Sequence, residues 1–148
     1  MQATPLREAD YHAGKWNGLG GKLELDESPI DGAVREFKEE SGVDVHPEAL
    51  VHLGVLQFPN FKAHKNEDWL VYLFKLHLTD LQAEQVVRQS DEGELHWIPQ
   101  EDLLKLNLWP GDRHFIPAVL ANEVIFATLW YDGPNVARVQ RRSVSFAP

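Results

Sequence analysis

The sequence contains no cysteine, and this absence excludes several kinds of chemistry. Disulfide bonds, thiolate nucleophiles and cysteine-ligated metal sites all require that side chain. A chain without disulfides is compatible with a reducing compartment, where such bonds are rare. We therefore expect any catalytic or metal-binding site to use other side chains.

Long apolar runs are also missing. Residues 1–15 contain no apolar core of the kind that signal peptides carry. The longest apolar stretch, residues 115–131, is interrupted by Pro117, Asn122 and Glu123, so it does not resemble a membrane span. We expect a cytoplasmic protein without a membrane partner.

An excess of positive charge is absent as well, since the formal net charge is −9. A surface this acidic repels a nucleic-acid backbone, which argues against a protein that binds DNA or RNA polymers. A small phosphorylated substrate remains compatible with this charge, because bound divalent cations invert the local field.

The 148 residues suit a single domain, and the whole chain is predicted to form one. Its apolar fraction of 43% and charged fraction of 25% are ordinary for a globular protein. Residues 1–15 are polar and are expected to form a short irregular N-terminal segment. No internal repeat or linker divides the sequence.

A helix is predicted to begin after Ser28 and to end near Ser41. Ser28 suits the N-cap, and Pro29 suits the first helical position. Gly42 is a natural helix terminator. Upstream, residues 22–25 alternate in polarity and predict a short strand.

The rest of the chain mixes strands and helices. Hydrophobic patterns predict strands at residues 50–58, 69–78, 94–98, 124–131 and 136–140. Helices are predicted at residues 99–106 and 113–121. This mixed order indicates an α+β fold or an α/β sandwich.

Three glutamates share one face of the predicted helix, because Glu36, Glu39 and Glu40 are spaced i, i+3, i+4. Like charges at this spacing repel one another, and a divalent cation would relieve the repulsion. Carboxylate oxygens suit Mg²⁺ or Mn²⁺. The alternative is a solvated acidic face without a ligand.

The surrounding residues favour the metal site. Residues 21–43 read GKLELDESPIDGAVREFKEESGV and match the pattern of the Nudix box. The fixed positions of the box are Gly21, Glu27, Arg35, Glu36, Glu39, Glu40 and Gly42. Phe37 is bulkier than the usual aliphatic residue at its position. The chain therefore resembles the Nudix hydrolases, and the resemblance implies an α/β/α sandwich with a mixed β-sheet.

The resemblance assigns roles to these residues. It implies that Glu36, Glu39, Glu40 and a backbone carbonyl near Gly21 bind Mg²⁺, with Mn²⁺ as a second possibility. Glu39, Glu40 and Arg35 are the expected catalytic residues of the box. Arg35 is expected to pair with Glu27 and to orient the carboxylates, although the alternative is an ordinary surface ion pair.

The reaction also needs a general base, which the box need not supply. In related enzymes, a glutamate in the loop corresponding to residues 89–94 binds metal or activates water. Glu92 is our first choice for this role and Glu94 the second. The alternative is an acidic loop that is simply solvated.

Outside the box, the chain resembles the 8-oxo-dGTP diphosphatases of the MutT-like branch, around residues 14–21 and 108–112. The resemblance implies that Asn17 hydrogen-bonds the base, that Trp109 stacks on it and that Asp112 reads its edge. Lys22 is a further candidate for substrate binding. Human-type relatives carry two neighbouring acids after the Trp-Pro pair, whereas Gly111 precedes Asp112 here. The alternatives are a helix cap for Asp112 and core packing for Trp109.

The start of the chain departs from the family pattern. Relatives have two strands before the segment that matches Trp16, and residues 1–15 are too short to supply both. A sheet edge left bare would invite a second chain, so both a monomer and a homodimer are considered.

The resemblance implies Mg²⁺-dependent hydrolysis of oxidised purine nucleoside triphosphates, with pyrophosphate as a product and a role in cleansing the nucleotide pool. Two alternatives stay open. One is a Nudix hydrolase of ADP-ribose, nucleotide sugars or dinucleoside polyphosphates. The other is a non-catalytic nucleotide-binding module.

Overall fold

The computed structural model describes residues 3–8, 15–62, 66–91 and 93–145. The chain divides into two compact units. Unit 1 comprises Met1–Leu50 and Leu76–Leu108, and unit 2 comprises Val51–Lys75 and Trp109–Pro148. Each unit is built around a four-stranded sheet.

The sheet of unit 1 has the order β2-β1-β6-β5. Its strands are β1 (Ala3–Glu8), β2 (Trp16–Asn17), β5 (Gln89–Ser90) and β6 (Gly93–Pro99). Neighbouring strands pair antiparallel throughout.

The expectation of an irregular N-terminal segment is wrong for Ala3–Glu8, which forms β1. The register with β6 sets Pro5 opposite Trp97, whereas β2 pairs only with Arg7 and Glu8. Pro5 therefore has a strand neighbour on one side only, where its missing N–H is tolerated. β1 owes its conformation to a partner about ninety residues away, and local patterns do not reveal such a partner.

The helices of unit 1 are α1 (Pro29–Ser41), α2 (Asp80–Gln85) and the 3₁₀ segments η1 (Pro47–Ala49) and η3 (Gln100–Lys105). The bounds of α1 confirm the predicted helix. α2 was not predicted, although Thr79 and Gln82 form a capping box at its start.

The predicted strand at residues 22–25 is wrong. The chain turns here instead, since the Glu27 N–H donates to the Glu24 carbonyl at 3.3 Å and Asp26 has a φ of 62°. The Lys22 carbonyl accepts a hydrogen bond from the Arg35 side chain rather than from a neighbouring strand.

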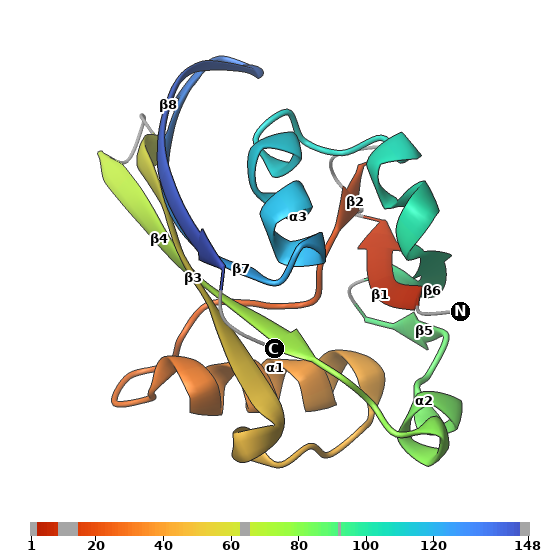
Figure 1. The fold of residues 1–148 in the computed structure, drawn as a ribbon. Helices are drawn as coiled ribbons and strands as arrows, with labels where there is room; N and C mark the ends of the chain where they lie inside the picture. The colour runs from red at the N-terminus through yellow and green to blue at the C-terminus, as the bar shows by residue number, and fades with distance from the viewer. Residues whose placement is uncertain (1–2, 9–14, 63–65, 92, 146–148) are drawn as a thin grey trace. The chain divides into compact units, whose positions relative to one another are not determined.

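The sheet of unit 2 has the order β4-β3-β7-β8. Its strands are β3 (Leu50–Lys62), β4 (Glu67–Leu76), β7 (Glu123–Asp132) and β8 (Asn135–Ser145), and Figure 1 shows β8 following β7 along a curved hairpin. β3 and β7 are parallel, whereas β7 and β8 are antiparallel. The mixed sheet with few helices confirms the predicted α+β class.

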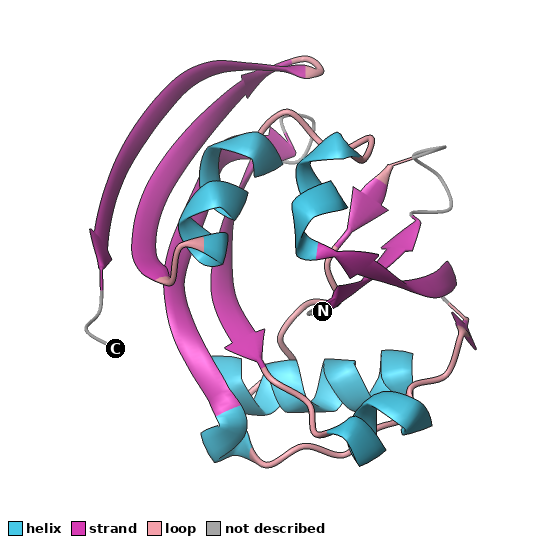
Figure 2. Ribbon diagram, turned by 45° about the vertical axis from the view of Figure 1, so that its right-hand side comes forward, coloured by secondary structure: helices cyan, strands magenta, loops and turns pink. Residues whose placement is uncertain are grey.

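The core of unit 2 lies between this sheet and α3 (Asp112–Leu120), which Figure 2 shows beside the curved strands. Ile125, Ala127 and Leu129 alternate along β7 toward the core, and each is at most 7% exposed. Leu56 of β3 and Ala118 of α3 complete the buried cluster. None of the helices in the described part of the chain has the length and apolar character needed to span a membrane.

Candidate metal and nucleotide site

The glutamates of the box lie on α1, a helix that is capped at both ends. The Ser28 hydroxyl accepts a hydrogen bond from the Asp31 N–H at 3.1 Å, as the N-cap prediction requires. At the other end Gly42 adopts a left-handed conformation with a φ of 78°, and its N–H donates to the Lys38 carbonyl. These local interactions place the three glutamates on ordered helical backbone.

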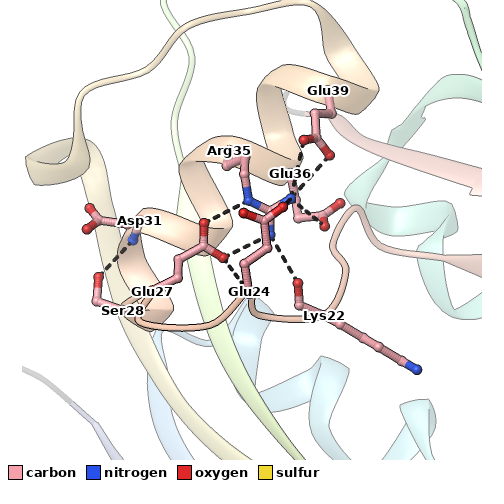
Figure 3. Close-up of polar contacts among 8 residues, drawn as sticks. All are labelled: Lys22, Glu24, Glu27, Ser28, Asp31, Arg35, Glu36 and Glu39. Atoms are coloured by element: carbon pink, nitrogen blue, oxygen red, sulfur yellow. Dashed lines mark hydrogen bonds and ion pairs between the residues drawn. The ribbon is translucent and has the colours of Figure 1, made fainter.

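Arg35 donates two hydrogen bonds to Glu27 (Figure 3). Arg35 Nε donates to Glu27 Oε2 at 2.7 Å, and Nη2 donates to Oε1 at 2.9 Å. The bond from Arg35 and a second bond from the Glu24 N–H lower the pKa of Glu27 from 4.5 to about 2. The same pairing raises the pKa of Arg35. The predicted Arg35–Glu27 pair is confirmed, and its two-pronged geometry separates it from an ordinary surface contact.

The remaining arm of the guanidinium reaches the box glutamates. Arg35 Nη1 lies 3.0 Å from Glu36 Oε1 and 3.2 Å from Glu39 Oε2. It also lies 3.7 Å from Glu24 Oε1. Sequence reasoning missed Glu24, although its place in the same loop, three residues before Glu27, was a usable signal. One arginine thus orients both Glu36 and Glu39.

The three box glutamates differ in burial. The side chain of Glu39 is 56% exposed, that of Glu36 is 13% exposed, and Glu40 as a residue is 2% exposed. Burial of a carboxylate is costly unless hydrogen bonds or positive charge compensate for it. A solvated acidic face therefore describes Glu39 at most and does not account for Glu40.

Gly21 lies directly against this cluster. A Cβ atom added at Gly21 would overlap the Glu36 carboxylate, so the absence of a side chain at Gly21 leaves room for this carboxylate. Carboxylates beside an exposed backbone form a set of hard oxygen donors, which fits Mg²⁺ or Mn²⁺. Among the described residues, however, no three His, Asp or Glu side chains are arranged to hold a metal ion. Arg35 engages Glu36 and Glu39 in this arrangement.

The two candidates for the general base have different outcomes. Glu92 lies outside the described residues. The side chain of Glu94 is 63% exposed on β6, and its Oε2 lies 3.1 Å from His96 Nε2. Lys22, the further substrate candidate, extends its amine away from the carboxylates in Figure 3.

The expected base readers come from both units. Asn17 is half-buried in β2 of unit 1, whereas Trp109 and Asp112 belong to unit 2. The role of these residues in reading the base stays a prediction. Asp112 is the first residue of α3, the N-cap is Gly111, and no side chain caps this helix. The capping role considered for Asp112 is therefore wrong.

Comparisons with known proteins match the box and the fold. A family model described as the NUDIX domain matches residues 4–119. An oxidized purine nucleoside triphosphate hydrolase of Mus musculus is 31% identical over 116 residues, which cover 78% of this chain and 69% of that protein. YvcI of Bacillus subtilis, an uncharacterized Nudix hydrolase, is 32% identical over 111 residues, which cover 74% of this chain and 67% of that protein.

Among solved structures, the chain is similar to a MutT protein from Bacillus halodurans, with a TM-score of 0.80 and 24% identity. The match covers 95% of this chain and 90% of that protein. At this identity the likeness shows the fold alone.

Proposed function

Because this chain belongs to the Nudix hydrolase family, we propose that it hydrolyses oxidised purine nucleoside triphosphates, such as 8-oxo-dGTP, to the monophosphate and pyrophosphate. Family membership makes it a hydrolase of phosphoric anhydrides that acts on a small nucleotide. The observation that carries the finer proposal is the 31% identity to a protein named for oxidised purine triphosphates. The further proposal is that the reaction requires Mg²⁺.

The donors proposed for the metal are the carboxylates of Glu36, Glu39 and Glu40, the Gly21 carbonyl and Glu92. When bound, Mg²⁺ neutralises phosphate oxygens and lowers the pKa of a bound water. Arg35 orients Glu36 and Glu39 through its Nη1 while Glu27 holds the other side of the guanidinium. Glu39 and Glu40 are proposed as catalytic residues together with Arg35, and Glu92 is the proposed general base.

The substrate contacts are proposed from the resemblance to the 8-oxo-dGTP diphosphatases. Trp109 stacks on the base, Asn17 and Asp112 hydrogen-bond its edge, and Lys22 is a further substrate-binding residue. Stacking supplies affinity for any base, while the polar groups discriminate one base edge from another.

We propose that both units belong to one Nudix domain that spans residues 1–148. The proposed role is to cleanse the nucleotide pool in the cytoplasm, with the protein acting as a monomer or homodimer. The family match at residues 4–119 runs through both units, which supports a single domain.

A substrate panel with Mg²⁺ tests the proposal. The kcat/KM values for 8-oxo-dGTP, dGTP, the other triphosphates and ADP-ribose are compared, and the products are identified, with Glu39→Gln as the inactive control. We expect 8-oxo-dGTP to be preferred, with pyrophosphate released. A preference for ADP-ribose, or equal rates on all triphosphates, would contradict the proposed substrate and retain the family chemistry.

A further inference from the structure

A hydrogen bond joins the end of β7 to the start of α3. The Gly111 N–H donates to the phenol oxygen of Tyr131 at 2.8 Å, across twenty residues of chain. Both residues belong to unit 2, so the contact is internal to that unit. Gly111 is buried, and a buried N–H without a hydrogen-bond acceptor costs free energy. The Tyr131 oxygen supplies that acceptor.

The contact requires glycine at position 111 for a steric reason. A Cβ atom added there would overlap the Tyr131 hydroxyl and would lie 3.2 Å from Tyr131 Cζ. The φ of Gly111 is −63°, a value that every L residue adopts easily. Glycine is therefore needed here for the approach of the phenol and not for its backbone freedom.

The position of the phenol is itself fixed by aromatic packing. The Tyr131 ring lies 5.7 Å from that of Phe61 in an edge-to-face contact and 6.1 Å from that of Phe58. Aromatic pairs at such distances have preferred geometries, so the ring has little freedom to follow a moving partner.

Gly111 in turn anchors the segment that carries the proposed base readers. The Asp112 N–H donates to the Trp109 carbonyl at 3.0 Å, which closes a tight turn around Gly111. The His114 N–H donates to the Gly111 carbonyl at 3.0 Å, which joins the turn to α3. Displacement of Gly111 would therefore move Trp109 and Asp112 together.

We propose that Tyr131 is a positioning residue for base recognition, which acts through Gly111 to hold Trp109 and Asp112 in place. This inference rests on the proposed function, because it takes Trp109 and Asp112 as the residues that contact the base.

A double-mutant cycle measured by thermal unfolding tests the coupling. Tyr131→Phe should lower Tm by a few degrees, because the Gly111 N–H loses its acceptor. Gly111→Ala should lower Tm strongly in the wild type and by less than half as much in the Tyr131→Phe background, where the overlapping oxygen is gone. Additive losses, or two glycine variants that both fail to fold, would overturn the coupling.

Base selectivity tests the positioning role separately from stability. In Tyr131→Phe, the ratio of kcat/KM between the best and worst triphosphate should fall about five-fold, the factor for one ordinary hydrogen bond. The loss should appear in KM, with kcat nearly unchanged. Tyr72→Phe, at an exposed residue of β4, is the matched control and should keep the wild-type ratio.

The outcomes separate the two proposals. A uniform loss of activity on every base, or an unchanged ratio, would overturn the positioning role of Tyr131 while leaving the proposed function intact. A wild-type enzyme that prefers an unoxidised base would overturn the proposed function, and the inference would still be judged by the change in ratio.

Discussion

Arg35 and Glu27 form a two-pronged ion pair, with Arg35 Nε 2.7 Å from one carboxylate oxygen and Nη2 2.9 Å from the other. The planar guanidinium matches the carboxylate in this geometry, which a lysine ammonium does not reproduce. The pair ties the loop before α1 to the helix and leaves Nη1 directed at Glu36 and Glu39.

The low pKa of Glu27 predicts a dependence of stability on pH. Because pairing lowers this pKa from 4.5 to about 2, the pair stabilises the fold above pH 4.5 and loses its contribution as the pH falls toward 2. The difference in the free energy of unfolding between wild type and Glu27→Gln, measured in urea, should therefore shrink over this interval. Glu84→Gln, at an exposed residue of α2, controls for removal of one carboxylate. A gap that stays constant from pH 6 to pH 2 would contradict the assignment.

Replacement of the guanidinium tests its orienting role. Arg35→Lys keeps the positive charge but loses the planar guanidinium and its several N–H donors. Glu36 and Glu39 should therefore lose their fixed orientation. We expect kcat/KM to fall about 10- to 100-fold, the usual effect of removing a partner of metal ligands. Titration with Mg²⁺ should show that half-maximal activity needs more metal, while circular dichroism confirms an intact fold. An unchanged Mg²⁺ requirement would leave Arg35 with a structural role alone.

Glu39→Gln should separate activity from folding. The side chain is 56% exposed, so the substitution should change stability little. The loss of a carboxylate proposed to bind the metal should reduce turnover by about 10²-fold or more. EDTA should abolish wild-type activity, and Mg²⁺ should raise the Tm of the wild type more than that of the variant. Glu48→Gln, in the same unit, is the control for removal of one carboxylate. Near-normal turnover in Glu39→Gln would show that Glu39 does not bind the metal.

Trp109→Ala should weaken the binding of purine nucleotides. Stacking of a base on an aromatic ring contributes about 1–3 kcal/mol, so KM should rise at least about five-fold. Steady-state kinetics on 8-oxo-dGTP and dGTP will measure this, with Trp97→Phe as the control for loss of an indole. If KM does not change for either substrate, Trp109 does not contact the base.

Gly54→Ala should be among the most destabilising substitutions in the chain. Gly54 has a φ of 123°, and a Cβ there would overlap the Ile125 carbonyl oxygen on the neighbouring parallel strand. Backbone on both sides of this contact cannot yield, so we expect a loss above about 4 kcal/mol or failure to fold. Gly18→Ala, where no atom lies within 4 Å of the added Cβ, is the matched control and should cost little stability. Equal stability of the two variants would contradict the predicted contact between β3 and β7.

Most of the secondary structure was predictable because its signals are local. Capping residues set both ends of α1, and hydrophobic patterns located β3, β4, β6, β7 and β8, whereas β1, β2 and β5 were not predicted. The errors at β1 and at residues 22–25 have a common cause. β1 is a strand because β6 pairs with it, and residues 22–25 are not a strand, since the Lys22 carbonyl accepts a hydrogen bond from the Arg35 side chain. Neither partner is visible from the pattern of the segment itself.

The site shows the same division. The sequence by itself determined the glutamate face of α1 and the Gly42 terminator, because helical periodicity and helix-ending residues are properties of a short segment. The Arg35–Glu27 pairing was implied by the resemblance to the Nudix box. Only the tertiary structure decided that Glu40 is buried, that Gly21 lies against Glu36 and that the Gly111 N–H donates to the Tyr131 hydroxyl. These features depend on which atoms the folded chain brings within contact distance, and contacts between distant residues are set by packing and not by spacing along the sequence.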